Sequence, residues 1–135
     1  MTSKPLDDQD EVLFRQIHPN FYDNSYPGSV QFAPSAKDEG QLSVDRGSLT
    51  TPAASHALYT GNGYASAAIY GVSVGEFGAE NLPCHPDPLA ATARQTANPA
   101  HAYADFTGVN SSQSRKIAKR LRNVAVARGR LHPLI

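Results

Sequence analysis

The stretch Ser111-Ser-Gln-Ser-Arg-Lys-Ile-Ala-Lys-Arg-Leu-Arg-Asn-Val-Ala-Val-Ala-Arg-Gly129 has the clearest local signals in this chain of 135 residues. Ser111 or Ser112 can cap the start of a helix, and Gly129 stands where helices commonly end. At about 100° per residue the apolar side chains share one face. They are Ile117, Ala118, Leu121, Val124 and Ala125. We therefore predict an amphipathic helix that packs against the rest of the protein.

The charge of the chain is divided between this C-terminal part and the body. Residues 111–135 contain seven Lys and Arg residues and no Asp or Glu, whereas residues 1–110 contain five Lys and Arg residues and all twelve acidic ones. The formal net charge of zero is therefore a cancellation of −7 in the body by +7 in the C-terminal part. Such a division bears on the partners of a protein rather than on its fold.

Four cations, the basic strip, are predicted to lie opposite the apolar face of the helix: Lys116, Lys119, Arg120 and Arg122. This strip is either a solvated surface or a binding surface for an acidic protein or a nucleic acid. It has no aromatic residue on which a base could stack, and the chain as a whole is not basic, so we prefer an acidic protein partner. Arg128 instead fits a favourable interaction with the end of the helix dipole.

The sequence before the helix predicts a small sheet. Five segments have the β-branched, aromatic or alternating residues that are typical of strands. They are Val12–His18, Ser29–Ala33, Gln41–Asp45, Ser66–Glu76 and Ala100–Phe106. Thr50 or Thr51 followed by Pro52 indicates a short helix that ends near Tyr59. Prolines make residues 78–99 an irregular crossing, within which Leu89–Arg94 is predicted to form one helical turn.

These elements predict a single α+β domain over residues 11–135, preceded by a flexible acidic tail over residues 1–10. The domain would have an antiparallel or mixed sheet of about four to five strands, a short central helix and the basic C-terminal helix packed on the sheet. No apolar run approaches the roughly 18 residues of a membrane span, and the polar, acidic start is unlike a secretory signal. We therefore expect a cytoplasmic protein without membrane contact, and its oligomeric state is left open.

The segment Pro19–Gly28 places three aromatic residues among loop-forming ones: Phe21, Tyr22 and Tyr26. Aromatic side chains in a loop either pack inward, which is the commoner arrangement, or form part of a binding surface. In the binding interpretation these three rings contact a partner together with the basic strip.

The chain has no strong catalytic or metal-binding motif. Its single cysteine excludes an internal disulfide and a cysteine-based zinc site, and its five histidines lack the HExxH spacing. We accordingly predict no metal and no cofactor. Cys84, His85 and Asp87 are close in sequence, but neighbouring side chains rarely converge on one reacting atom, so this segment is interpreted as a rigid turn. Two histidines can act as general acid and general base in the cleavage of a phosphodiester, as His18 and His101 would here. Their spacing in the sequence does not support this role.

One enzymatic alternative uses Arg15, Ser43 and Glu76, which lie on three of the predicted strands. The order of an arginine, a serine-bearing strand and a later glutamate resembles that of ADP-ribosyltransferase-like domains. The resemblance implies that Arg15 would hold the phosphates of nicotinamide dinucleotide and that Glu76 would stabilise charge on the ribose. The chain departs from that pattern because it has no pair of glutamates at one-residue spacing and its intervals are short.

Four segments also resemble a group of small bacterial proteins with no established activity. They are Leu13–Pro19, Lys37–Val44, Leu82–Pro88 and Asn98–His101. This similarity covers nearly the whole chain and implies a bacterial setting without implying a mechanism. From the divided charge and the lack of a catalytic motif we expect a non-enzymatic binding protein of a bacterial multi-protein system, such as toxin neutralisation or phage defence. An ADP-ribosyltransferase-like enzyme and a nucleic-acid-binding module are the alternatives.

Overall fold

The structure is a computed structural model that describes residues 4–134, and it confirms the predicted α+β fold. Its main feature is a five-stranded antiparallel sheet in the order β5-β1-β4-β7-β6. The strands of this sheet are β1 (Val12–Ile17), β4 (Gln41–Arg46), β5 (Ala68–Ser73), β6 (Cys84–Pro86) and β7 (His101–Asp105). A two-stranded sheet is formed by β2 (Tyr22–Asp23) and β3 (Tyr26–Pro27).

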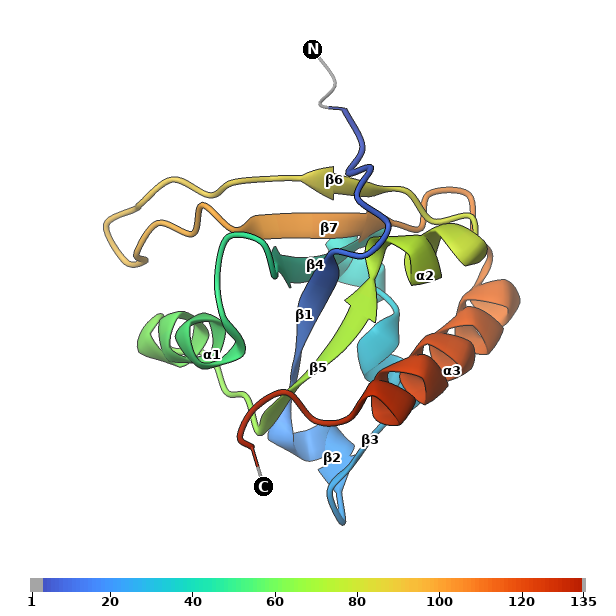
Figure 1. The fold of residues 1–135 in the computed structure, drawn as a ribbon, viewed down its shortest axis with the longest axis horizontal. Helices are drawn as coiled ribbons and strands as arrows, with labels where there is room; N and C mark the ends of the chain where they lie inside the picture. The colour runs from blue at the N-terminus through green and yellow to red at the C-terminus, as the bar shows by residue number, and fades with distance from the viewer. Residues whose placement is uncertain (1–3, 135) are drawn as a thin grey trace.

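Helices cover the sheet from two sides (Figure 1). The α-helices are α1 (Pro52–Gly61), α2 (Val74–Ala79) and α3 (Ser111–Arg128). Three short 3-10 helices are η1 (Pro19–Phe21), η2 (Ser29–Phe32) and η3 (Ala36–Asp38). In Figure 1, α1 and α3 stand on opposite sides of β1 and β5.

The C-terminal helix α3 agrees closely with its prediction. Asn110, rather than a serine, caps the helix, because its side chain accepts a hydrogen bond from the backbone N–H of Gln113 at 2.8 Å. Gly129 follows the last turn with a φ of 101°. Val124 is half-buried, and the other four residues of the predicted inner face are fully buried. They are Ile117, Ala118, Leu121 and Ala125.

Strand β5 lies at one edge of the main sheet but is buried along its whole length, and it ends three residues before the predicted Glu76. Ser73 Oγ accepts a hydrogen bond from the N–H of Glu76 at 3.1 Å, and the carboxylate of Glu76 accepts one from the N–H of Ser73 at 2.7 Å. This reciprocal capping starts α2, so Glu76 lies on a helix rather than on a strand. Gly71 allows close packing inside β5, since a Cβ there would lie 2.6 Å from the side chain of Val12.

Two other predicted elements are wrong. Ser29–Ala33 is not a strand but forms η2, because the carbonyl of Gly28 accepts a hydrogen bond from Gln31 and the turn buries Phe32 in the core. Leu89–Arg94 is not helical. Instead Leu89 and Asn98 pair through two backbone hydrogen bonds of 2.9 Å and close the loop between them. The same crossing contains β6, which the sequence did not indicate.

Residues 4–10, which belong to the predicted flexible tail, contact the domain. Leu6 packs on the core, and its N–H donates to the carbonyl of Cys84 at 2.8 Å. The carbonyl of Gln9 accepts a hydrogen bond from Gly75 at 3.0 Å. This segment therefore covers α2 and β6, while the first three residues of the predicted tail lie outside the described residues.

The strands of the main sheet are joined unevenly. β1 pairs with β5 at six positions and β4 pairs with β7 at five. β1 and β4 pair at only two positions, through Leu13 and Phe14 of β1. Beyond these positions the two strands diverge, and Figure 1 shows β1 and β5 running across the direction of β6 and β7. Gln31 of η2 enters the gap, where its side chain accepts a hydrogen bond from the N–H of His18 at 2.8 Å.

Candidate functional site

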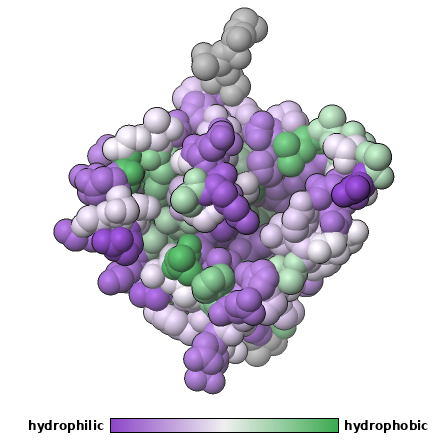
Figure 2. Space-filling model, turned by 180° about the vertical axis from the view of Figure 1, so that it is seen from behind, coloured by the Kyte–Doolittle hydropathy of each residue, from purple (hydrophilic) through white to green (hydrophobic). Residues whose placement is uncertain are grey.

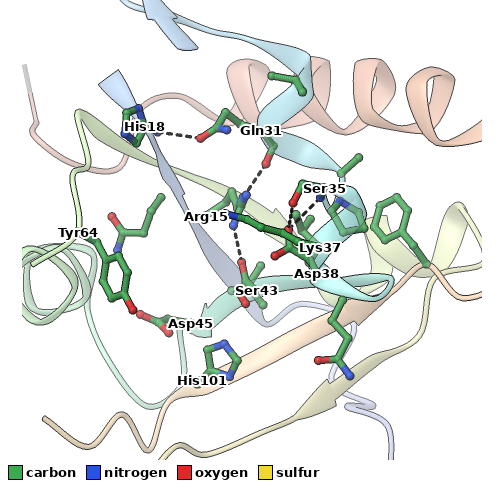
Figure 3. A pocket seen from close by; sticks show the side chains of 18 of the residues that line it. Arg15, His18, Gln31, Ser35, Lys37, Asp38, Ser43, Asp45, Tyr64 and His101 are labelled. Atoms are coloured by element: carbon green, nitrogen blue, oxygen red, sulfur yellow. Dashed lines mark hydrogen bonds between the residues drawn. The ribbon is translucent and has the colours of Figure 1, made fainter. Parts of the chain in front are cut away.

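A cleft of about 1200 Å³ lies where β1 and β4 diverge. Its walls come from these strands, from residues 29–38, from α1, from the loop 89–98 and from the N-terminal half of α3. Figure 3 shows polar side chains from these segments around the cleft, with Arg15 near the centre. Figure 2 shows the molecule from behind, with hydrophilic residues over much of this face and hydrophobic residues in separate places among them. The cleft thus combines polar and apolar groups from distant parts of the sequence.

The guanidinium of Arg15 lies in the gap between the two strands. Its Nε donates to the backbone carbonyl of Gln31 at 2.6 Å, and its Nη1 donates to the backbone carbonyl of Ser43 at 3.0 Å. Both acceptors fix the side chain, but neither carries a net charge. Within residues 4–134, no carboxylate oxygen lies within 4.0 Å of this guanidinium. Arg15 is therefore held in place without being neutralised.

The surroundings of Arg15 disfavour its charge. Burial lowers the pKa of Arg15, and the nearby Tyr59 and Asp38 oppose that change. Arginine nevertheless stays protonated in proteins at neutral pH. Because Arg15 is half-buried, the lowered pKa reflects a partial loss of hydration around its charge, which an anion in the cleft would offset.

One of the two carboxylates that line the cleft, Asp45, belongs to a polar network. It accepts hydrogen bonds from Ser55 Oγ at 2.6 Å and from Asn98 Nδ2 at 2.9 Å. Ser55 Oγ in turn accepts from Gln16 Nε2 at 3.1 Å, and Gln16 accepts from Ser66 Oγ at 2.6 Å. This network ties α1 to β1 and β4. The carboxylate of Asp45 is satisfied within it.

The other carboxylate, Asp38, is bound by its own turn. It accepts hydrogen bonds from the N–H and the hydroxyl of Ser35 at 2.9 and 2.7 Å. Partial burial raises the pKa of Asp38, but the bonds from Ser35 and the charges of Lys37 and Arg15 together hold it below its usual value. Asp38 is therefore ionised at neutral pH and acts on Arg15 only from a distance.

Two histidines line the cleft with different hydrogen bonds. His18 Nδ1 accepts from the N–H of Asn20 at 3.1 Å, which caps η1. His101 Nδ1 lies 3.0 Å from the carbonyl and 3.2 Å from the carboxylate of Asp87. Figure 3 places Arg15 between the two imidazoles, which stand at separate ends of the labelled group. This arrangement gives no support to the two histidines acting together on one phosphodiester.

The structure brings together two of the three residues of the enzymatic alternative. Arg15 and Ser43 both line the cleft, and the contact between them uses the backbone carbonyl of Ser43. Glu76 is not among the lining residues, because its carboxylate caps α2 and accepts a hydrogen bond from Arg128 at 2.7 Å. The glutamate that an ADP-ribosyltransferase-like reaction needs beside the arginine is thus bound elsewhere.

The cysteine of the proline-rich segment is buried and unreactive. Burial, with a smaller effect from the charge of Glu11, raises the pKa of Cys84 to about 12. A thiol with this pKa is almost never the thiolate at neutral pH and is a poor nucleophile. His85 stacks on Tyr103 with ring centroids 5.4 Å apart. Residues 84–86 form the strand β6, which pairs with β7, so the interpretation of this segment as a rigid turn is wrong there.

Several cations of the C-terminal part have partners within the protein. Arg120 of the predicted basic strip makes two hydrogen bonds to Glu80, at 2.7 and 2.8 Å. The guanidinium of Arg122 lies 5.1 Å from the ring centre of Tyr26. Arg128 donates to Glu76 at 2.7 Å and to the carbonyl of Gly71 at 2.8 Å. The basic strip is therefore partly neutralised from outside α3.

Three cations in the N-terminal half of α3 differ from these, and we call them the basic patch: Arg115, Lys116 and Lys119. They are exposed, and in the part of the chain that the structure describes none of them makes an ion pair. Arg115 and Lys119 also line the cleft. The free positive charge of the helix thus lies beside the cleft.

The aromatic loop is divided between the surface and the interior. Phe21 and Tyr26 are 43% and 47% exposed. Tyr22 is half-buried, and its hydroxyl contacts the hydroxyl of Tyr70 at 3.1 Å and accepts from Arg130 at 3.2 Å. Two of the three predicted binding residues are therefore available to a partner, whereas Tyr22 also supports the fold.

Comparison with protein-family models, with curated proteins and with solved structures finds no match. Among residues 4–134, no group of three or more His, Cys, Asp or Glu side chains is arranged to hold a metal ion. No helix in the same range combines the length and apolar character needed to cross a membrane. The function must therefore be inferred from the chemistry of the cleft and of α3.

The central role of Arg15 could have been noticed in the sequence. Arg15 lies between Leu13 and Ile17, so strand alternation puts it on the same face as these two buried residues. A cation on the inner face of a strand is unusual and needs a polar partner. Its position at the gap in the sheet, by contrast, depends on the pairing of β1 with β4 and has no local signal.

Proposed function

We propose that the protein is a non-enzymatic binding protein that recognises an acidic protein through the basic patch and the exposed rings of the aromatic loop. The observation that carries this proposal is the lack of an ion pair at Arg115, Lys116 and Lys119 in the described chain, beside paired Arg120 and Arg128. Exposed cations without partners keep their charge for interaction with another molecule.

The patch leads toward the aromatic loop. Residues three or four apart on a helix are neighbours, so Arg115, Lys119 and Arg122 follow one another along α3. Arg122 lies over the ring of Tyr26, which is exposed. A partner surface with a few carboxylates and an apolar group would match this row of cations that ends at an aromatic ring. Arginine and tyrosine are also common at the energetic centre of protein interfaces.

A protein partner is favoured over a nucleic acid by the number of available charges. Binding to nucleic acid depends on contacts of Lys and Arg with phosphates, and its strength grows with their number. The patch offers three cations, and the body of the chain carries a formal charge of −7, which repels a long polyanion. Because the chain resembles small bacterial proteins, we place this role in a cytoplasmic bacterial system of the toxin-neutralisation or phage-defence type.

The test reverses charge inside and outside the patch. Lys116→Glu with Lys119→Glu changes the net charge by the same amount as Lys4→Glu with Arg94→Glu, which are exposed and distant from the patch in sequence. Tagged parent and both double variants are used to capture partners from extract of the source cells, without and with nuclease treatment. We expect one protein to be retained by the parent and by the control pair but lost by the patch variant.

Retention of the same protein by a folded patch variant would contradict the proposal. Capture that disappears after nuclease treatment would instead indicate a nucleic acid. In that case binding of parent and variants to RNA and duplex DNA should fall steeply as salt is raised.

A further inference from the structure

Arg15 still has donors to offer inside the cleft. An arginine side chain has five N–H donors, and the two hydrogen bonds of Arg15 use its Nε and Nη1. Its Nη2 makes no hydrogen bond to any described residue. In residues 4–134, the one side-chain nitrogen or oxygen that is both buried and without a hydrogen bond is Nε of Arg130. Nη2 of Arg15 also lacks a hydrogen bond, so it is not buried, and it is accessible from the cleft that Arg15 lines. A donor-bearing nitrogen therefore faces open space.

The guanidinium is also fixed before any ligand arrives. Its two carbonyl acceptors belong to η2 and β4, which lie on different sides of the gap. A planar guanidinium held in one orientation matches the paired oxygens of a carboxylate or a phosphate. Because the side chain is already ordered, little conformational entropy is lost on binding.

The charge balance of the cleft favours an anion. The lining contains four cationic side chains and two carboxylates. The cations are Arg15, Lys37, Arg115 and Lys119. Both carboxylates, Asp38 and Asp45, accept hydrogen bonds from neighbouring residues of the protein. A half-buried cation without a counter-ion, as at Arg15, is unfavourable, and a bound anion would relieve this.

An aromatic wall stands beside the cation. The rings of Tyr59 and Tyr64 stack with centroids 4.9 Å apart and planes 25° apart, and both rings line the cleft. Burial raises the pKa of Tyr59, while the charge of Arg15 opposes this rise, so the phenol is neutral and close enough to feel the guanidinium. Flat apolar groups pack well on such rings.

We propose that the cleft is a binding site for a small aromatic anion whose carboxylate or phosphate group contacts Arg15 and whose ring lies against Tyr59 and Tyr64. The volume of about 1200 Å³ is ample for a ligand of this kind. The cleft shares Arg115 and Lys119 with the basic patch, but the proposal does not rest on the partner-binding function, because the groups that contact the ligand are Arg15 on β1 and the rings of Tyr59 and Tyr64.

Calorimetric titration of the parent protein with four probes at constant ionic strength tests the proposal. The probes are phenyl phosphate, benzoate, inorganic phosphate and the neutral benzamide. We expect one-to-one binding of phenyl phosphate or benzoate, with benzamide weaker by at least about tenfold because it lacks the charge. The stronger of the two aromatic anions distinguishes a phosphate from a carboxylate ligand. Inorganic phosphate should bind more weakly than phenyl phosphate, since it makes no contact with the rings.

Arg15→Gln should weaken binding of the aromatic anion by about 10- to 100-fold, which corresponds to the loss of a charge-assisted hydrogen bond. The matched control Arg94→Gln removes the same charge from an exposed residue outside the cleft lining and should leave binding unchanged. Tyr64→Ala, at a side chain 48% exposed, should weaken phenyl phosphate but not inorganic phosphate.

Two results would overturn the proposal: equal affinity of Arg15→Gln and the parent for phenyl phosphate and benzoate, or no saturable binding of either anion at millimolar concentration. If Arg15→Gln does not fold, the side-chain nitrogen resonances of Arg15 in the parent decide the matter. They should shift on titration with the bound anion, and unmoved resonances would reject the site.

Discussion

The outer face of α3 and the cleft use cationic residues in opposite ways. On α3, Arg120 and Arg128 are neutralised by Glu80 and Glu76, which come from a distant part of the chain. In the cleft, Arg15 is held by two uncharged carbonyls. The divided charge of the sequence points to the helix, yet two cations of the helix are compensated by ion pairs, whereas the half-buried Arg15 in the cleft is not. The number of charges in a segment is thus a weaker guide to function than the partner of each charge.

The largest loss of stability is expected from a substitution on the buried face of α3, in contrast to one on its exposed face. Leu121 is 1% exposed and belongs to the core cluster, so Leu121→Ala should lower the free energy of unfolding by about 2–5 kcal/mol through loss of burial and a residual cavity. Lys116→Ala, on the exposed face, should change it by less than about 0.5 kcal/mol. Urea denaturation of both variants measures the difference. Equal losses would mean that the helix does not pack as described.

The second largest loss of stability is expected when Arg46 loses the carboxylate that compensates its charge, because it then lacks an ion-pair partner as Arg15 does. Glu11 is 6% exposed and accepts hydrogen bonds from Arg46 Nε and Nη2, both at 3.1 Å, and from Ser48 Oγ at 2.6 Å. Glu11→Gln leaves Arg46 without its carboxylate and should lower the free energy of unfolding by roughly 2–3 kcal/mol. Glu39→Gln makes the same chemical change at an exposed site. A loss no larger than that of this control would contradict the role of the pair.

The same pair should make stability depend on pH. Burial raises the pKa of Glu11, but the hydrogen bonds from Arg46 and Ser48 and the charge of Arg46 outweigh it and leave the pKa below the usual 4.5. The folded state then binds the proton less readily than the unfolded state. The stabilisation is therefore present above pH 4.5 and is lost as the pH falls below 4.5 through the lowered pKa of Glu11.

Urea denaturation at neutral pH and at a pH well below 4.5 checks this dependence. The parent should lose more stability between the two conditions than Glu11→Gln, which has no carboxyl group to protonate at this position. Identical losses for parent and variant would show that other groups control the acid sensitivity. Asp38, Glu76 and Glu80 also have lowered pKa values and contribute to the remaining loss.

The smallest expected effect concerns the ion pair between Arg120 of α3 and Glu80, which follows α2. The Arg120 side chain is 56% exposed, so water replaces much of the interaction when its partner is removed. Glu80→Gln should leave the midpoint of urea unfolding nearly unchanged, and any small shift should shrink as salt is added. A shift as large as that of Glu11→Gln would show that the pair of Arg120 with Glu80 stabilises the fold as much as the pair of Arg46 with Glu11.

The elements that the sequence predicts well are those with complete local signals. α3 has a capping residue, a terminal glycine and a continuous apolar face, and α1 begins at Pro52 after the Thr51 cap. Ser29–Ala33 was misread because its alternation of apolar and polar residues also fits a 3-10 turn that buries one ring. The capping pair Ser73 and Glu76 is a local signal for the start of α2 inside a segment that reads as strand.

The candidate site was less predictable because it depends on contacts between distant residues. Arg15 contacts Gln31 and Ser43, and the second of these lies 28 positions away in the chain. The pairing of Arg120 with Glu80 spans 40 positions and removes this cation from the strip that helical periodicity predicts. Periodicity places a charge on a face of an element. Only the fold determines which charge it meets.

The narrow contact between β1 and β4 also has a consequence for backbone amide exchange. In the described part of the chain, strand pairing joins β5-β1 to β4-β7-β6 at two residue pairs, and the N–H of Gly47 adds a hydrogen bond to the carbonyl of Val12. Strand groups joined by so few hydrogen bonds open as separate units, so amides at this seam should exchange with solvent sooner than those between β1 and β5. The side chain of Arg15 starts on β1 and hydrogen-bonds to β4, so it spans the seam. An anion seated on it would slow exchange in both strand groups at once.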